Sequence, residues 1–154
     1  MGCRTPPRRD GRGEGDLQSK TEKAIALYRG HFLEKDDEKP WTASLREKLR
    51  IKFLRAVKAQ GEYWQQKAGS MKKAADRKEA LKKTIDCFER GLEVDDVTEE
   101  FYQKLMLCYQ QMGAKAEALK AYKRCRVALS AAFGIEPSEE TENVYRSVLG
   151  RRIT

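Results

Sequence analysis

Apolar side chains recur along this sequence with the spacing of helices. Between Leu17 and Leu149 they return every three or four positions, which places them on one face of a helix. No segment sustains the two-residue alternation of apolar and β-branched residues that a half-buried strand shows. The pattern therefore predicts no sheet and six helices, over about residues 17–30, 40–68, 80–94, 98–112, 114–133 and 139–149.

Two of these helices repeat one another at an interval of 34 residues. The matching positions are Thr84 and Ala118, Ile85 and Leu119, Phe88 and Tyr122, and Arg90 and Arg124. This interval is typical of tetratricopeptide repeats, whose helix pairs stack because one pair alone cannot bury its apolar faces. The expected fold class is all-α, a tetratricopeptide-like right-handed superhelix of about six helices, and such arrays generally hold another macromolecule.

Local signals indicate where helices begin and end. Asp96 and Glu99 have the three-residue spacing of a capping box at the start of a helix. Gly30 and Gly134 follow apolar stripes, and Gly134 suits the left-handed residue that ends a helix. Ser138 is placed to cap the last helix.

The helix expected after Pro40 has apolar residues on two of its sides. Phe53 and Val57 continue one stripe, whereas Ile51 and Leu54 lie off it. A helix of this kind packs against two neighbours, so this segment is expected inside a stacked array.

The N-terminal segment differs in composition from the remainder of the chain. Residues 1–16 contain four arginines, four glycines and two prolines with almost nothing apolar, and are expected to form a disordered basic leader ahead of a domain over residues 17–152. No apolar stretch follows the arginines as in a secretory signal, and no run of about 18 apolar residues predicts a membrane span. The protein is therefore expected to be cytoplasmic.

The formal net charge of +8 raises the question of nucleic-acid binding. Acidic residues gather where helices begin, an arrangement that complements the helix dipole. Basic residues gather in helix bodies, where they form either a solvated face or a phosphate-binding surface. The basic clusters are Arg46 to Lys58, Lys67 to Lys83, and Lys115 to Arg126.

Residues suited to catalysis or metal binding are few and scattered. The four cysteines have no C-x-x-C spacing, and His31 is the single histidine, so no metal or cofactor site and no catalytic residues are expected. Neighbouring carboxylates such as Glu99 and Glu100 diverge on a helix and read as partners of its dipole. The chain is therefore not expected to be an enzyme.

The aromatic residues could stack on bases, but most follow the apolar stripes. They are expected to pack in the core: Tyr63, Trp64, Phe88, Phe101, Tyr102, Tyr109, Tyr122 and Phe133.

Several separated blocks resemble one known family, the bacterial transcriptional activation domain. The resemblance extends from Ala24 to Leu149, and its blocks keep the family's order and spacing. They are residues 27–33, Pro40-Trp41 followed by Arg46 and Leu49, residues 80–95, residues 101–113 with Ala118, Leu119 and Tyr122, and Leu129 with residues 133–141.

The resemblance implies a tetratricopeptide-like regulatory domain of bacterial transcription regulators, closest in look to the C-terminal domain of large ATP-dependent regulators similar to the maltose-operon activator. No winged helix and no phosphate-binding loop are present, so DNA is expected to be bound only through a DNA-binding domain absent from this chain. Gly91 stands where the repeat usually carries alanine, and is expected to loosen its helix end by roughly 0.5–1 kcal/mol.

The first functional hypothesis is a surface that binds a protein partner, either the transcription machinery or other domains of the parent regulator. In repeats of this type the first helix of each pair lines the concave surface, which is expected to present Glu100, Gln103, Leu107, Gln110 and Gln111, with Arg46 and Arg50 facing an acidic partner. The alternatives are non-specific nucleic-acid binding by the basic helices and a generic scaffold unrelated to transcription. The last helix is expected either to cap the array or to pair with a second copy in a homodimer.

Overall fold

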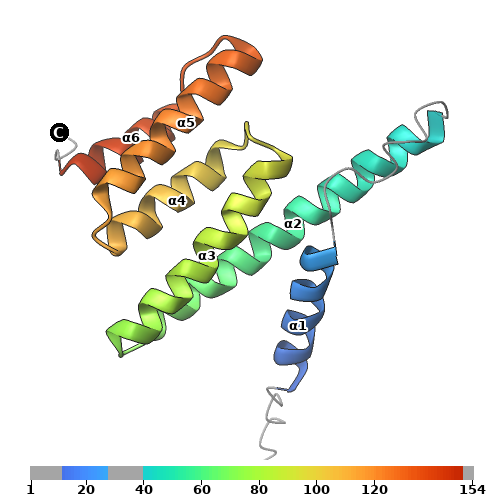
Figure 1. Cartoon of the computed structure of the whole chain (residues 1–154), viewed down its shortest axis with the longest axis horizontal. Helices are drawn as coiled ribbons and strands as arrows, with labels where there is room; N and C mark the ends of the chain where they lie inside the picture. The colour runs from blue at the N-terminus through green and yellow to red at the C-terminus, as the bar shows by residue number, and fades with distance from the viewer. Residues whose placement is uncertain (1–11, 28–39, 151–154) are drawn as a thin grey trace, which may run out of the picture.

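The computed structural model describes residues 12–27 and 40–150, and this part of the chain is helical and contains no strand (Figure 1). Six helices follow one another, as the apolar periodicity predicts. They are α1 (Arg12–Leu27), α2 (Pro40–Ser70), α3 (Ala74–Val94), α4 (Glu99–Gln111), α5 (Lys115–Phe133) and α6 (Glu139–Leu149). None of the described helices is both long enough and apolar enough to cross a bilayer.

The helix expected from residue 17 begins five residues earlier, at Arg12, while the domain bounds of 17–152 stay a prediction. Residues 12–16, assigned to the leader for their glycines and charges, continue the helix that the apolar residues of 17–27 establish. Residues 1–11, and the helix end expected at Gly30, lie outside the described residues.

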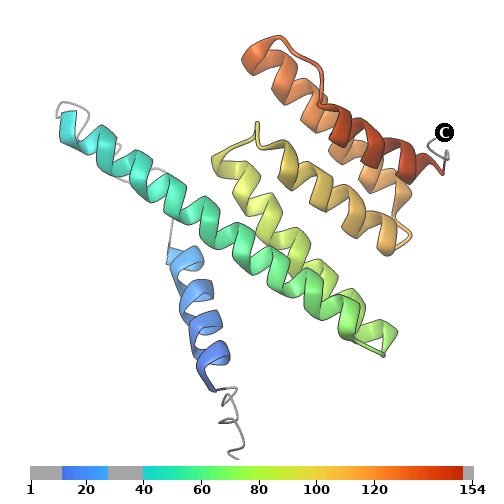
Figure 2. The same ribbon diagram turned by 180° about the vertical axis from the view of Figure 1, so that it is seen from behind.

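The helices form antiparallel neighbours in a stacked array, with α2 between α1 and α3 and with α4, α5 and α6 grouped on the far side of α3 (Figures 1 and 2). The two neighbours expected for α2 are thus α1 and α3. Leu54 is partly buried against the core, while Ile51 is 38% exposed. The core runs through all six helices and includes Ile25, Val57, Phe88, Leu105 and Val148.

Two helical glycines let large aromatic rings approach the helix backbone. A Cβ atom at Gly61 of α2 would lie 2.6 Å from Cζ of Phe88, and one at Gly91 of α3 would lie 2.5 Å from Cε2 of Phe101. Distances below 3.0 Å cannot be accommodated without a shift of the ring. The expectation that Gly91 only loosens its helix is therefore wrong: its missing side chain is the space that Phe101 of α4 occupies.

The capping box expected at Asp96 and Glu99 does not form. The N-cap residue of α4 is Thr98, which makes no side-chain capping bond, and Asp95 instead accepts a hydrogen bond from the Val97 amide at 3.3 Å. The Glu99 carboxylate turns away from its own helix start and accepts hydrogen bonds at 2.8 Å from the Ser138 hydroxyl and 2.5 Å from the Thr141 hydroxyl. A residue expected to cap α4 therefore fastens α6.

The end of the array follows the expected pattern. Gly134 is left-handed, with φ of 66°, and caps α5, and the Ser138 hydroxyl accepts a hydrogen bond from the Thr141 amide at the start of α6. Val148 is buried against α4 and α5, and the Tyr145 ring stacks on that of Tyr122 with centroids 3.9 Å apart. The helix α6 thus packs its apolar face on the array, which agrees with the expectation that the last helix covers the end of the array.

Candidate functional site

A groove runs along the C-terminal half of α5, where this helix passes the connection between α3 and α4. It encloses about 540 Å³ and continues across α5 toward Glu136. Its lining residues are Leu92, Asp96, Tyr102, Lys123, Arg124, Val127, Ala128 and Ala131.

The floor of the α5 groove is built from buried residues of α3 and α4. Leu92 and Tyr102 are both at most 4% exposed, and the Tyr102 hydroxyl donates a hydrogen bond to the Asp96 carbonyl at 2.9 Å. Burial raises the pKa of Tyr102 to about 12, so this hydroxyl keeps its proton at neutral pH and the bond persists. The floor is consequently buried and largely apolar.

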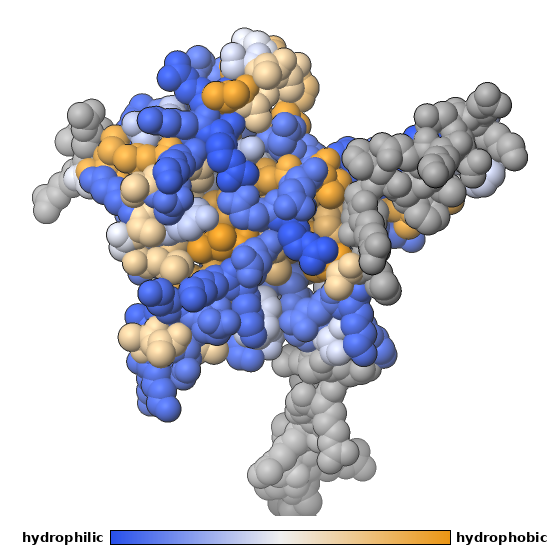
Figure 3. All heavy atoms as spheres, viewed as in Figure 1, coloured by the Kyte–Doolittle hydropathy of each residue, from blue (hydrophilic) through white to orange (hydrophobic). Residues whose placement is uncertain are grey.

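The helix α5 forms one wall of the groove and extends further at its C-terminal end than the 34-residue frame predicts from α3. Val94, the last residue of α3, corresponds in this frame to Ala128, but α5 continues to Phe133. The segment around this overhang carries exposed apolar side chains, with Val127 at 69%, Phe133 at 61% and Ile135 at 50% (Figure 3). The core position expected for Phe133 is therefore wrong, because none of the described helices covers its side chain.

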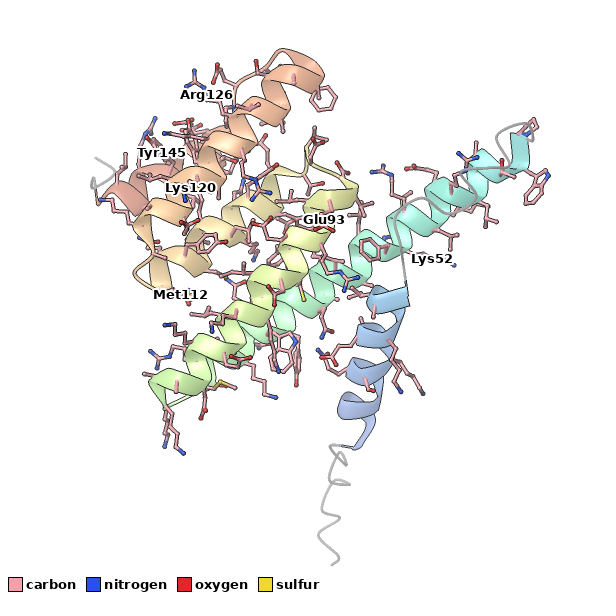
Figure 4. All side chains as sticks on the ribbon, in the orientation of Figure 1. Lys52, Glu93, Met112, Lys120, Arg126 and Tyr145 are labelled. Carbon is pink, nitrogen blue, oxygen red and sulfur yellow. The ribbon has the colours of Figure 1, made fainter. Side chains whose placement is uncertain are left out.

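Basic side chains form the rim of the groove. Arg124 makes a bidentate ion pair with Glu89 of α3, at 2.8 and 2.9 Å, and Arg126, which is labelled on α5 in Figure 4, pairs with Glu136 at 2.9 Å. Lys123 is exposed between them and forms no ion pair with any residue of the described segments. The groove thus combines an apolar floor with one uncompensated positive charge on its rim.

The residues expected on the concave surface of α4 already make contacts within the chain. The Gln103 amide donates to the Thr141 hydroxyl at 2.9 Å, and the Gln110 amide donates to the Ser147 carbonyl at 3.2 Å, so both hold α6. Glu100 forms an ion pair with Lys58 of α2 at 2.8 Å. The helix α6 therefore lies on the part of α4 that was expected to meet a partner.

The other predicted partner-binding residues are not gathered with these. Arg50 of α2 pairs with Asp95 at 2.9 Å and with Glu47 at 3.0 Å, and Arg46 lies one turn earlier on the same helix. Leu107 is half-buried and Gln111 is exposed at the end of α4. Their role in binding a partner stays a prediction.

The sequence placed Lys123 in a basic cluster, but it did not single out Val127, the exposed apolar residue of the α5 groove. A signal was available, because Val127 lies off the stripe of Ala118, Ala121, Cys125 and Leu129 that α5 buries. An apolar residue on the polar side of a helix, followed by Phe133 and Ile135, indicates an uncovered apolar surface.

The described cysteines are unsuited to nucleophilic chemistry. Burial raises the pKa of the Cys108 and Cys125 thiols to about 12 and that of the Cys87 thiol to about 11, so all three are protonated at neutral pH. No cluster of metal-ligating side chains occurs in the portion of the chain that the structure describes, and Cys3 and His31 lie outside it.

The chain is similar to a known family over almost its whole length. The family model described as bacterial transcriptional activator domain matches residues 8–149, a span that includes all six helices. No curated protein and no solved structure matches the chain.

Proposed function

Because the chain belongs to the bacterial transcriptional activator domain family, a regulatory and not an enzymatic family of helical domains, we propose that it binds an acidic, amphipathic segment of a partner protein in the α5 groove. The observation that carries the proposal is the exposure of Val127 beside a buried floor and an unpaired Lys123.

The chemistry of the groove favours a helical segment as its occupant. Amphipathic helices bind in grooves of this kind by placing apolar side chains on the floor and charged ones at the rim. Lys123 and Arg126 stand on the same face of α5 as Val127 and favour carboxylates over basic side chains. The volume of about 540 Å³ suffices for a few apolar side chains, which is the size of an anchor and not of a complete interface.

The groove supports this role better than the α4 surface does. The amides of Gln103 and Gln110 are engaged by α6, so a partner there would first have to replace those hydrogen bonds. A partner that binds in the α5 groove would not have to displace another part of the described chain from Val127, because this side chain is exposed.

A reporter assay tests the proposal. The full chain is fused to a heterologous DNA-binding domain that binds upstream of a weak bacterial promoter, and transcription is measured. We expect activation by the unaltered chain and a loss of activation of about tenfold or more for Val127→Asp, because an ionised carboxylate cannot enter an apolar anchor site. Lys123→Glu is expected to reduce activation as well.

Ala116→Asp is the matched control, since Ala116 is an exposed residue of α5 outside the groove. Circular dichroism of both aspartate variants establishes that each is folded. If folded Val127→Asp activates as well as Ala116→Asp does, the groove is not the docking site.

A further inference from the structure

The end of the α2–α3 hairpin carries a dense cluster of positive charge. Residues 67–83 contain seven basic and two acidic residues, a net charge of +5 out of the +8 of the whole sequence. All seven basic side chains are exposed, and we refer to them as the hairpin patch: Lys67, Lys72, Lys73, Arg77, Lys78, Lys82 and Lys83.

The charges of the hairpin patch are not compensated by ion pairs within the described residues. Some basic residues elsewhere do form ion pairs across helices, as Arg50 does with Asp95, Lys58 with Glu100 and Arg124 with Glu89. Within the described residues no member of the hairpin patch forms an ion pair. The segment 67–83 contains only two acidic residues, Asp76 and Glu79. Its charges are therefore free to bind an external anion.

Packing on Trp64 brings together lysines from the two helices. The Lys83 ammonium lies 4.1 Å from the centroid of the Trp64 ring, and the Lys67 ammonium lies 4.9 Å from it. These cation–π contacts hold the side chains of α2 and α3 side by side without neutralising them. The hairpin end projects beyond α4 and α5 in both views, so its charges are accessible to a large partner (Figures 1 and 2).

The start of α3 adds a second feature that favours an anion. Its N-cap residue is Lys73, which makes no side-chain capping bond, so the first amide groups of a 21-residue helix receive no side-chain cap. Amide groups at a helix N-terminus bind phosphate, and here Lys72 and Lys73 stand beside them. Asp76 in the first turn opposes this only in part.

From these observations we propose that the hairpin patch binds the phosphate backbone of duplex DNA. A domain of transcriptional activators works next to DNA, and lysines that reach phosphates bind without reading the bases. The patch would hold the domain against DNA flanking the site that a separate DNA-binding domain recognises. This binding is independent of the α5 groove, which lies at the opposite end of α3.

The test is a fluorescence anisotropy titration of the full chain with short labelled duplexes of two unrelated sequences, at about 50 and 200 mM salt. We expect similar affinity for both sequences and a log–log salt slope of about −5, corresponding to five or six phosphates. The variant K72Q/K78Q/K82Q should lose on the order of tenfold in affinity for each lysine at the lower salt, and its slope should fall in magnitude by about 3.

The matched control is K48Q/K52Q/R55Q, which removes the same number of charges from exposed positions on the first half of α2. It should retain most of the affinity and the slope of the unaltered chain. Three results would overturn the proposal: no binding at the lower salt, equal losses in the two triple variants, or binding to phosphatidylserine vesicles with none to DNA. Circular dichroism confirms that both variants are folded.

Discussion

Arg90 and Arg124, which are 34 residues apart, each reach back to the second helix before their own. Arg90 of α3 donates a hydrogen bond to the Ile25 carbonyl of α1 at 2.8 Å, and Arg124 of α5 binds Glu89 of α3. The repeat therefore conserves an interaction along one side of the array as well as an apolar pattern. The acceptor changes from a main-chain carbonyl of α1 to a carboxylate of α3.

The contact from Arg90 leads to a prediction about α1. Arg90→Ala removes a hydrogen bond from a charged donor, worth about 1.5–3 kcal/mol, and leaves α1 held mainly by its packing on α2. Amide hydrogens of α1 should then exchange about tenfold faster or more, while those of α4 to α6 are unchanged. Hydrogen exchange with mass spectrometry measures this, and Lys82→Ala on the exposed side of α3 serves as the control. Unchanged exchange in α1 would show that Arg90 does not hold it.

A methyl group at Gly91 is predicted to destabilise the protein, although alanine is the better helix former. The added Cβ would overlap Phe101, and overpacking of this kind costs about 1–3 kcal/mol. Gly69→Ala is the matched change, since no atom lies within 4 Å of a Cβ there, and it should stabilise α2 by up to about 1 kcal/mol. Urea unfolding of the two variants should give free-energy changes of opposite sign. A Gly91→Ala variant as stable as the parent would contradict the close approach of α3 and α4.

Stability is predicted to fall at acidic pH partly through Glu99. Burial raises the pKa of Glu99, but the hydrogen bonds from Thr141 and Ser138 lower it by more, so the pKa lies below the ordinary value of 4.5. The unfolded chain then binds the proton more readily, and the contribution of Glu99 is complete above about pH 5 and is lost as the pH falls through the folded-state pKa. Unfolding free energies of the parent and Glu99→Gln, measured from pH 7 to pH 3, should converge as the pH falls. A constant difference between them would exclude this linkage.

Cysteine labelling is predicted to follow burial. Cys87 is half-buried whereas Cys108 and Cys125 are fully buried, and all three thiols have raised pKa values. Iodoacetamide at pH 8 should modify Cys87 slowly, and Cys108 and Cys125 only when the helices open. Peptide mass spectrometry distinguishes the sites, and addition of urea should abolish the difference. Early labelling of Cys108 in the folded protein would contradict its place in the core.

The helices were predictable because periodicity and end signals are local. Gly134 and Ser138 act on residues within one turn, and their sequence neighbourhood is enough to assign them. Glu99 shows where such reasoning stops, since its spacing from Asp96 suits a cap but its hydrogen-bond partners lie 39 and 42 residues away.

The candidate site was harder to predict for the same reason. Periodicity shows that a helix has an apolar face, but it does not show which neighbour covers that face. Gln103 and Gln110 look solvated until α6 is placed on them, and Phe133 looks buried until α5 is seen to extend past its neighbours.

The contact between Gly91 and Phe101 also means that the helix pairs are not interchangeable modules. A recombinant that transplanted the residues of α5 into α3 by a 34-residue shift would place the side chain of Cys125 at position 91, against the Phe101 ring. Each pair has been fitted to the next, so substitutions at Gly91 and Phe101 have to be made together. Reordering, duplicating or averaging the units would therefore require this interface to be redesigned first.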